Sequence, residues 1–328
     1  MSTPISRTAY VTGATGFLGH QLCVELRTQD WDITAIARKP EAAPELAALG
    51  VKVVAGDIVD AESIAIPAGT DTVFHVAGDT SLWHKRDAMQ TRINVDGTRH
   101  VLAAARTAGV RRVVVTSTVS AYGTQTQRFD EATPSRAAMS SINYERSKWL
   151  GEEEARKAAA AGQDIVILQP GAIIGPKDSK NWGRMFLLLQ SGKLPLLPPG
   201  RLSFNHVREI ARAHVAAATQ GRAGESYLLG GHDTSLADMA RGACELLGIK
   251  PPRLTAPAPV LGLLGTVLGS LTPASSGEPL MTREMARLMC VTTVVDSAKA
   301  ERELGFKATP LRECLADCHA WLRQAGLL

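Results

Sequence analysis

The side chains best suited to chemistry in this sequence are a tyrosine and a lysine four positions apart, Tyr144 and Lys148. Residues with this spacing project from the same face of a helix, so the two groups would lie side by side. A phenol has a pKa of about 10 and exchanges protons poorly near neutral pH, but a neighbouring cation favours its ionised form. The pair could therefore serve as a general acid and base, with Lys148 lowering the pKa of Tyr144.

A second candidate site is the glycine-rich stretch near the start of the chain, where Gly13, Gly16 and Gly19 recur at every third position. A short apolar run precedes it and a helical pattern follows it. Glycines allow a tight turn and a close approach to a pyrophosphate, whose charge then meets the free N–H groups at a helix start. At the first strand-to-helix turn, this spacing predicts a dinucleotide-binding loop.

The type of nicotinamide cofactor depends on the residues after the second predicted strand. An acidic residue there would accept hydrogen bonds from the ribose 2′-hydroxyl of NAD, but this sequence has Arg38 and Lys39. Both can pair with a 2′-phosphate, which predicts NADP(H); a solvated basic turn is the other interpretation. After the third strand, Asp57 could bind the adenine amino group or cap the next helix.

Short apolar runs and amphipathic segments alternate through the first half of the chain, and these elements must position the two sites. Runs rich in Val and Ile are typical of parallel strands buried on both faces. We expect strands at residues 8–12, 33–37, 52–55, 72–76, 112–116 and 164–169, and helices at 19–29, 41–49, 94–108 and 144–161. The alternation predicts an α/β fold of the Rossmann type, a doubly wound parallel sheet with ligands at the carboxyl ends of its strands.

After residue 175 prolines interrupt this rhythm, and helical patterns remain at residues 236–247, 282–288 and 310–324. We expect residues 1–175 to form an NADP-binding core and residues 176–328 a smaller, mainly helical lobe that binds substrate. Part of this lobe, about residues 204–230, would return to the core, because residues 227–229 have the pattern of a strand that rejoins the main sheet.

The composition excludes several classes of protein. The 328 residues include 36 Lys and Arg against 32 Asp and Glu, and the basic residues are scattered, which argues against a nucleic-acid surface. Five cysteines without disulfide-like spacing favour a reducing compartment. Residues 1–8 show no secretory signal, and the longest apolar stretch, residues 257–271, is too short to span a bilayer. We expect a soluble, cytoplasmic protein; contact of that stretch with a membrane surface is an alternative.

Taken together, these motifs make the sequence resemble the extended short-chain dehydrogenases/reductases, the NAD-dependent epimerase/dehydratase family. The likeness is strongest to its dihydroflavonol reductase and 3β-hydroxysteroid dehydrogenase-like members. The matching segments follow the family order over nearly the whole chain, at residues 12–19, 56–58, 74–78, 94–98, 116–123, 144–148, 169–176, 204–207 and 304–306.

The resemblance implies a role for each matching residue. Tyr144 would protonate the developing alkoxide, and Lys148 would bind the nicotinamide ribose. Thr118 would hydrogen-bond the substrate carbonyl oxygen, with Ser117 as a competing candidate, and Asn94 would support a water-linked proton relay. The cofactor would contact Tyr144 and Lys148 and also Gly13, Thr15, Gly16, Phe17, Leu18, Gly19, Arg38, Lys39, Asp57, Ile58, Ala77, Gly78, Pro170, Gly171, Ala172 and Ile173.

Within the resembled family, the reductase branch fits best. Thr118 is followed by Val119 rather than by the acidic pair of the dehydratases, and the basic turn at Arg38 is similar to that of the reductases. We expect NADP(H)-dependent interconversion of a carbonyl and an alcohol on a lipophilic or aromatic substrate. An NDP-sugar epimerase is the alternative, and a nucleotide sensor without turnover is a third. The resemblance also implies a homodimer, formed by the helices that begin near residues 94 and 144.

Four further features of the sequence have an ordinary structural interpretation, as core or surface, beside a functional one. The leucines of the lobe could line a hydrophobic ligand or form a core. Cys314, Cys318 and His319 lie on one amphipathic segment without further ligands, so packing is favoured over a metal site. The acidic run at residues 152–154 is most simply a solvated helix face. The loop containing Trp83, His84 and Arg86 could contact substrate or lie at the surface.

Overall fold

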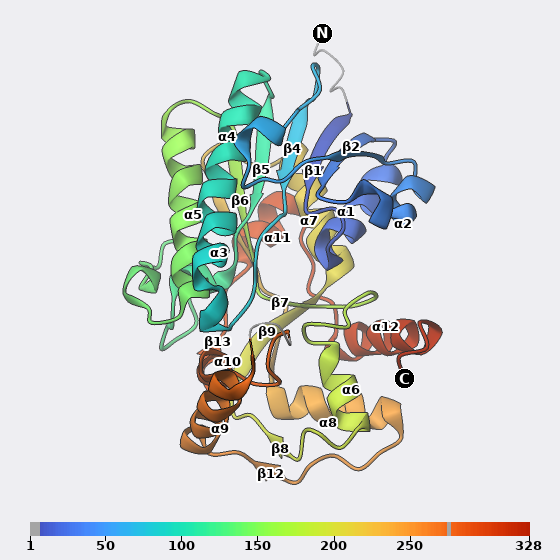
Figure 1. Cartoon of the computed structure of the whole chain (residues 1–328), viewed down its shortest axis with the longest axis vertical. Helices are drawn as coiled ribbons and strands as arrows, with labels where there is room; N and C mark the ends of the chain where they lie inside the picture. Colours follow the sequence, from blue (N-terminus) through green and yellow to red (C-terminus); the bar gives the residue numbers. More distant parts are fainter. Residues whose placement is uncertain (1–6, 274–276) are drawn as a thin grey trace.

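The computed structural model describes residues 7–273 and 277–328. The first six residues, where the sequence shows no secretory signal, lie outside this part. The centre of the molecule is a seven-stranded sheet with strand order β10-β6-β5-β4-β1-β2-β3, and every neighbouring pair in it is parallel (Figure 1). Its strands are β1 (Thr8–Thr12), β2 (Asp32–Ala37), β3 (Lys52–Ala55), β4 (Thr72–His75), β5 (Arg112–Thr116), β6 (Ile165–Pro170) and β10 (Ser226–Leu229).

Helices cover both faces of this sheet, because successive strand residues point to opposite sides and both sides are apolar. On one face Val113 and Val115 pack with α4 (Gly97–Thr107) and α5 (Asn143–Ala160). On the other face Val114 packs with α1 (Phe17–Arg27), α7 (Val207–Thr219) and α11 (Ala298–Leu304). The doubly wound parallel sheet predicted from the sequence is thus confirmed.

The chain returns from the lobe to the main sheet, although not with all the residues expected. Strand β10 pairs with β6 and α7 packs on the sheet, but residues 204–206 belong to β9 (Arg201–His206) in a second sheet. The returning stretch therefore begins at Val207, and α11 returns later in the chain. The division into a core of residues 1–175 and a lobe of 176–328 stays a prediction.

The lobe is mainly helical, with two small sheets that the sequence analysis did not predict; their strands have two to six residues. One sheet joins β9 to β7 (Ala172–Ile174), β11 (His232–Ser235) and β13 (Thr292–Thr293); the other pairs β8 (Leu196–Leu197) with β12 (Leu254–Thr255). Its helices are α6 (Arg184–Gln190), α8 (Leu236–Leu247), α9 (Ala258–Leu271), α10 (Arg283–Leu288) and α12 (Leu311–Gln324). Leucines such as Leu189 and Leu197 lie in the core of this lobe with Cys314 and Cys318, so they do not line a ligand.

Two predicted helices of the first half differ in the structure. The segment 41–49 is a 3-10 turn, η1 (Pro40–Ala42), followed by the short α2 (Pro44–Ala48). Pro44 disfavours helical backbone at Ala43, which separates the two pieces. The helix expected at residue 94 begins earlier, as α3 (Asp87–Thr91), and passes through a π-helical turn, η4 (Arg92–Asp96), before α4. Asn94 lies in this widened turn.

Candidate active site

The glycine-rich loop closes tightly between β1 and α1, and its geometry fits a dinucleotide. A Cβ atom at Gly19 would lie 2.1 Å from the carbonyl oxygen of Gly13, and one at Gly13 would lie 2.6 Å from the backbone nitrogen of Ala77. Both distances are too short for a side chain, so only glycine allows the loop to fold so closely. Helix α1 begins after Gly16 without a side-chain cap, which leaves its first N–H groups available to a phosphate. Thr15 and Gly16 are exposed, whereas Phe17 and Leu18 are partly buried.

His75, at the end of β4, ties this loop to the helices behind it. Its Nδ1 lies 2.8 Å from Thr12 Oγ1 and its Nε2 lies 2.9 Å from Thr98 Oγ1. Thr98 donates its hydroxyl proton to the carbonyl oxygen of Asn94, so its oxygen accepts from His75, and Nε2 carries the ring proton. The neutral imidazole therefore satisfies every group in the chain of bonds. Burial, with a smaller effect from Lys148, lowers the pKa of His75 to about 3.

Acid is expected to destabilise the protein between pH 6.5 and about 4. Burial also lowers the pKa of His214 to about 4. In this pH range both histidines are protonated in the unfolded chain and stay neutral in the folded chain. The free energy of unfolding should then fall by about 1.4 kcal/mol per pH unit for each histidine. Urea midpoints at pH 7 and pH 5 measure this. His75→Gln should reduce the change by about a third, because burial also lowers the pKa of His20 to about 4. Equal midpoints at the two pH values would contradict it.

Tyr144 and Lys148 extend from the first turns of α5, both half-buried. The ammonium of Lys148 donates to the carbonyl oxygen of Thr116 over 2.8 Å, and burial lowers its pKa to about 8. Burial raises the pKa of Tyr144, with additional effects of Glu145 and Asp79, while a hydrogen bond with the Thr118 side chain lowers it. The structure thus differs from the expected depression by Lys148. Tyr144 holds its proton at neutral pH, which is the form that a general acid needs.

Thr118 and Ser117 point to different places after β5. Thr118 lies at Tyr144 and also near the carbonyl oxygen of Pro170, at 3.4 Å, where the chain leaves β6. Ser117 donates over 2.6 Å to Glu152 of α5 and is buried. Of the two competing candidates, Thr118 is therefore the one that lies beside the tyrosine.

Glu152 is a correction to the sequence analysis, because its side chain is buried rather than solvated. Gln169 of β6 donates to both of its carboxylate oxygens at 2.9 Å, and Arg156 donates over 2.6 Å. Together with Ser117, these donors give the carboxylate four hydrogen bonds, three from residues at the sheet and one from Arg156 within α5. It fastens the helix that carries Tyr144 and Lys148 to the ends of two strands.

Asn94 is buried and its amide is fully engaged. Its Oδ1 accepts from the backbone N–H of Asp79 at 2.8 Å, and its Nδ2 donates to the Asp79 carbonyl and to Ser147 Oγ. The backbone carbonyl of Asn94 faces Gly151, whose missing Cβ would lie only 2.2 Å away. The side chain thus joins the loop after β4 to α5, which is a positioning arrangement. The water-linked proton relay expected for Asn94 stays a prediction.

The structure adds Asp79 to the candidate site, a residue that the motifs did not single out. Its carboxylate accepts from Ser81 N and from Arg86, both at 2.8 Å, and it lies near enough to raise the pKa of Tyr144. Trp83 of the same loop is buried and donates its indole N–H to the carbonyl of Gly269 in α9. The contact spans 186 positions of sequence, so no local pattern could have revealed it.

The residues expected at the adenosine end lie at the ends of β2 and β3. Arg38 and Lys39 are exposed, and within residues 7–273 and 277–328 their side chains make no hydrogen bond or ion pair. Asp57 is half-buried and its carboxylate accepts from Val59 N at 3.2 Å, so it caps its own turn. Ile58 is buried, with its side chain against Gly97.

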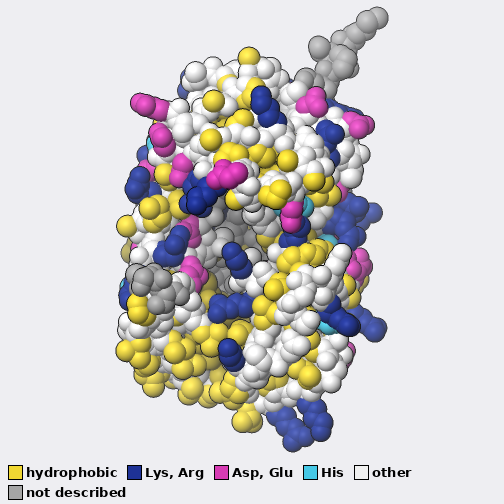
Figure 2. All heavy atoms as spheres, turned by 45° about the vertical axis from the view of Figure 1, so that its right-hand side comes forward, with side chains coloured by type: hydrophobic (Ala, Val, Ile, Leu, Met, Phe, Trp, Pro, Cys, Tyr) yellow, Lys and Arg dark blue, Asp and Glu magenta, His cyan; other side chains and the backbone are white. Residues whose placement is uncertain are grey.

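The remaining predicted cofactor residues lie at the carboxyl ends of β4 and β6. Ala77 and Gly78 follow β4, and a Cβ atom at Gly78 would lie 3.3 Å from Asn94 Oδ1 and 3.6 Å from Lys148 Nζ. Pro170 ends β6, and Ala172 and Ile173 belong to β7. Gly171 joins the two strands where a Cβ would lie 2.7 Å from the carbonyl of Ser203. Figure 2 shows the molecule hollowed between the part with the large sheet and the lobe, with basic side chains around the hollow.

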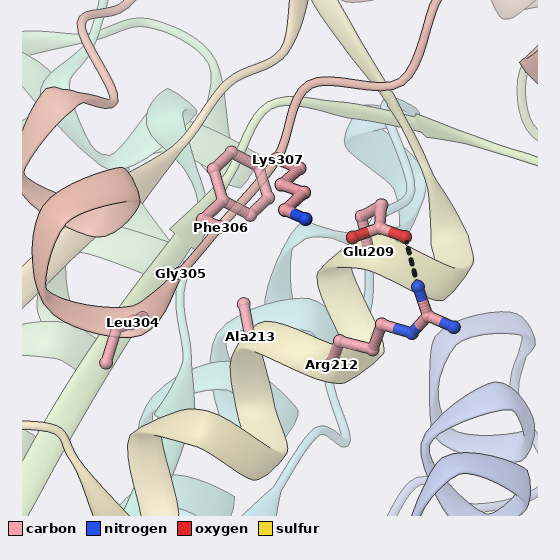
Figure 3. Close-up of a pocket in the computed structure, with 7 residues that line it drawn as sticks. All are labelled: Glu209, Arg212, Ala213, Leu304, Gly305, Phe306 and Lys307. Carbon is pink, nitrogen blue, oxygen red and sulfur yellow. Dashed lines mark hydrogen bonds and ion pairs between the residues drawn. The ribbon is translucent and has the colours of Figure 1, made fainter.

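A separate hollow of about 200 Å³ lies beside α7 and the turn after α11 (Figure 3). Glu209 and Arg212 of α7 form an ion pair at its edge, at 2.8 Å. None of the predicted site residues lines it, so it is not part of the candidate active site. Within the described part of the chain, no group of three or more His, Cys, Asp or Glu side chains is placed to hold a metal ion.

Comparison with known proteins identifies the family. The model of the NAD dependent epimerase/dehydratase family matches residues 9–230. A putative dihydroflavonol 4-reductase of Synechocystis is 32% identical, with 97% of this chain and 95% of the relative covered. Sterol demethylase protein B of Methylococcus capsulatus is 31% identical, with 98% and 100% covered. The solved structure of MoeE5 with UDP-glucose and NAD is 25% identical with a TM-score of 0.78, covering 97% of this chain and 99% of that one. The chain therefore belongs to the NAD-dependent epimerase/dehydratase family, the extended short-chain dehydrogenases/reductases, and is an enzyme that acts on CH–OH or carbonyl groups.

Proposed function

We propose that the protein is an NADP(H)-dependent reductase that interconverts a ketone or aldehyde and an alcohol on a lipophilic or aromatic substrate. The observation that carries the proposal is the placement of Tyr144, still protonated, beside the Thr118 hydroxyl at the carboxyl edge of the sheet. Two hydroxyl groups that converge in this way can both donate to one oxygen, which a carbonyl under reduction requires.

Each residue of the site has its own role in carbonyl reduction. Bound NADPH supplies the hydride. Thr118 and Tyr144 orient the carbonyl oxygen, and Tyr144 donates its proton as negative charge develops there. Lys148, held by the Thr116 carbonyl, binds the nicotinamide ribose and keeps a positive charge behind the tyrosine. Asn94 holds the loop of Asp79 against α5 and so positions the site, and it would also support the water-linked proton relay.

Cofactor preference is the part of the proposal that depends on Arg38. Its guanidinium is exposed and unpaired among the described residues, as a 2′-phosphate ligand must be before binding. Arg38→Ser should raise the Kd for NADPH about tenfold or more while leaving the Kd for NADH within about twofold, since one charged hydrogen-bonding group is worth about 1.5–3 kcal/mol. Fluorescence titration with both cofactors measures this, and Arg136→Ser, which changes an exposed arginine elsewhere, is the control. If the Kd values for NADPH and NADH rose by the same factor, Arg38 would not be a ligand of the 2′-phosphate.

The lipophilic substrate class is supported by the names of two relatives, a dihydroflavonol 4-reductase and a sterol demethylase component. The second candidate function, a sugar-nucleotide epimerase, is favoured by the solved relative that holds UDP-glucose. The absorbance of NADPH, followed in the presence of a panel of ketones, aromatic aldehydes and sugar nucleotides, distinguishes the reductase from the epimerase. Net oxidation with a ketone supports the reductase; conversion of a sugar nucleotide without net oxidation would establish the epimerase instead.

A further inference from the structure

Helix α9 has an inverted arrangement of side chains. A helix on a protein surface normally turns its large apolar residues inward and its polar residues outward. In α9 the inward row is Leu261, Gly265 and Gly269, and a Cβ atom at Gly265 would lie 2.3 Å from the Thr282 carbonyl. The outward side carries large apolar residues with high exposed fractions: Val260 48%, Leu263 68%, Leu264 45%, Val267 45% and Leu271 75%.

The apolar area continues beyond the helix and has a basic margin. Leu254 in β12 is 68% exposed, and the neighbouring Lys250 and Arg253 are exposed as well. Helix α9 itself contains no charged residue. Figure 2 shows this lower end of the molecule as a broad hydrophobic area with basic side chains at its margins and hardly any acidic ones. Clustered exposed apolar side chains mark interaction surfaces, whereas single ones need no explanation.

We infer that the outward side of α9, with Leu254, Lys250 and Arg253, docks on an anionic phospholipid surface. A bilayer interface accepts leucine and valine side chains a few ångströms deep and attracts lysine and arginine to its phosphates. Helix α9 has 14 residues, about 21 Å, and so lies along the surface. No helix in the described ranges of the chain is long and apolar enough to cross a membrane.

A second copy of the chain fits this surface less well than a bilayer does. In a twofold contact the same patch lies on both sides, and this patch contains no acidic residue, so Lys250 and Arg253 would find no opposite charge on the patch of a partner copy. Lipid phosphates, in contrast, attract both side chains. The charge pattern therefore selects the lipid surface.

The docking surface is joined to the candidate active site. Trp83 and Lys85, from the loop that begins at Asp79, bind the carbonyl oxygens of Gly269 and Thr272 at the end of α9, at 3.2 and 3.0 Å. If the proposed function holds, a lipophilic substrate dissolved in the bilayer would reach the protein next to this loop. That extension rests on the proposed function, but the docking itself does not.

Sedimentation of the full-length protein with vesicles tests the docking. The protein should pellet with vesicles of phosphatidylcholine and phosphatidylglycerol and less with phosphatidylcholine alone. L263E/V267E should lower the partition coefficient at least about tenfold, because each change replaces an exposed apolar side chain that the bilayer would bury by a charged one. L327E adds one such charge at an exposed leucine next to the C-terminus, which lies beside α12 and away from α9 in Figure 1, and should bind like the parent protein.

Three outcomes would overturn the inference: no binding of the parent protein to anionic vesicles, equal binding by L263E/V267E, or conversion of a dimer to a monomer by that variant in analytical ultracentrifugation. The last would assign the surface to a second copy. Circular dichroism confirms that the variants fold. NADPH oxidation with a water-soluble ketone is measured in parallel, so loss of docking and failure of the proposed reductase activity are told apart.

Discussion

Tyr144→Phe should lower kcat for carbonyl reduction about 10²- to 10⁴-fold, the range that one general acid contributes. The change removes only the hydroxyl that meets Thr118, and the ring keeps its place on α5. The Kd for NADPH should stay within about threefold, because neither the glycine-rich loop nor Lys148 is altered. Steady-state kinetics and a fluorescence titration measure the two quantities.

Tyr122→Phe is the matched control. Tyr122 is buried in a neighbouring turn, and its hydroxyl donates to Gln169 over 3.3 Å rather than facing Thr118. This variant should lose some stability and keep its turnover within about threefold. If Tyr144→Phe kept more than a tenth of the parent kcat, or if both variants lost activity equally, Tyr144 would not be the acid.

Glu152→Ala should lower the free energy of unfolding by about 3 kcal/mol. The truncation leaves Gln169 and Ser117 without acceptors in the interior, and a buried unpaired donor costs about 1–3 kcal/mol. Loss of the salt bridge to Arg156 contributes less to the fall in the free energy of unfolding, since that arginine is 41% exposed. Urea unfolding at pH 7 measures the change.

Glu153→Ala is the matched control for Glu152→Ala. It removes the same negative charge from α5 but no buried hydrogen bonds, so it separates the two effects. Glu153 is the next residue on α5 and its side chain is 38% exposed, with Arg156 4.0 Å away. Its loss should change stability by no more than about 0.5 kcal/mol. Equal losses for the two variants would mean that the bonds of Glu152 contribute nothing beyond a surface ion pair.

The contrast between these two neighbours explains what the sequence could and could not predict. Three consecutive glutamates look alike along the chain, and only the fold brings Ser117 and Gln169 to one of them. By comparison, β5 and β6 were predictable, because a strand buried on both faces is a nearly continuous apolar run. The glycine-rich turn was predictable for a similar reason, since backbone crowding at Gly13 and Gly19 admits no other residue.

Contacts between distant segments account for most of what was missed. Trp83 contacts α9 across 186 positions, and the backbone of Asp79 is held at the site by the side chains of Asn94 and Gln90. Helix α9 is apolar almost all round, so its composition could not show which side faces outward. That orientation depends on Gly265 fitting against Thr282, a contact between two helices.

The π-helical turn at η4 has a consequence for how related chains can vary in length. A helix advances about 100° per residue, so the extra residue in this turn sets the rotation of α3 relative to α4. Gln90 of α3 is buried and donates to the carbonyl oxygens of Asp79 and Ser81. Deleting Ile93 would restore a regular helix and swing Gln90 away from that loop. A gap of one residue in an alignment of this helix thus marks a relative whose Asp79 loop is held in some other way.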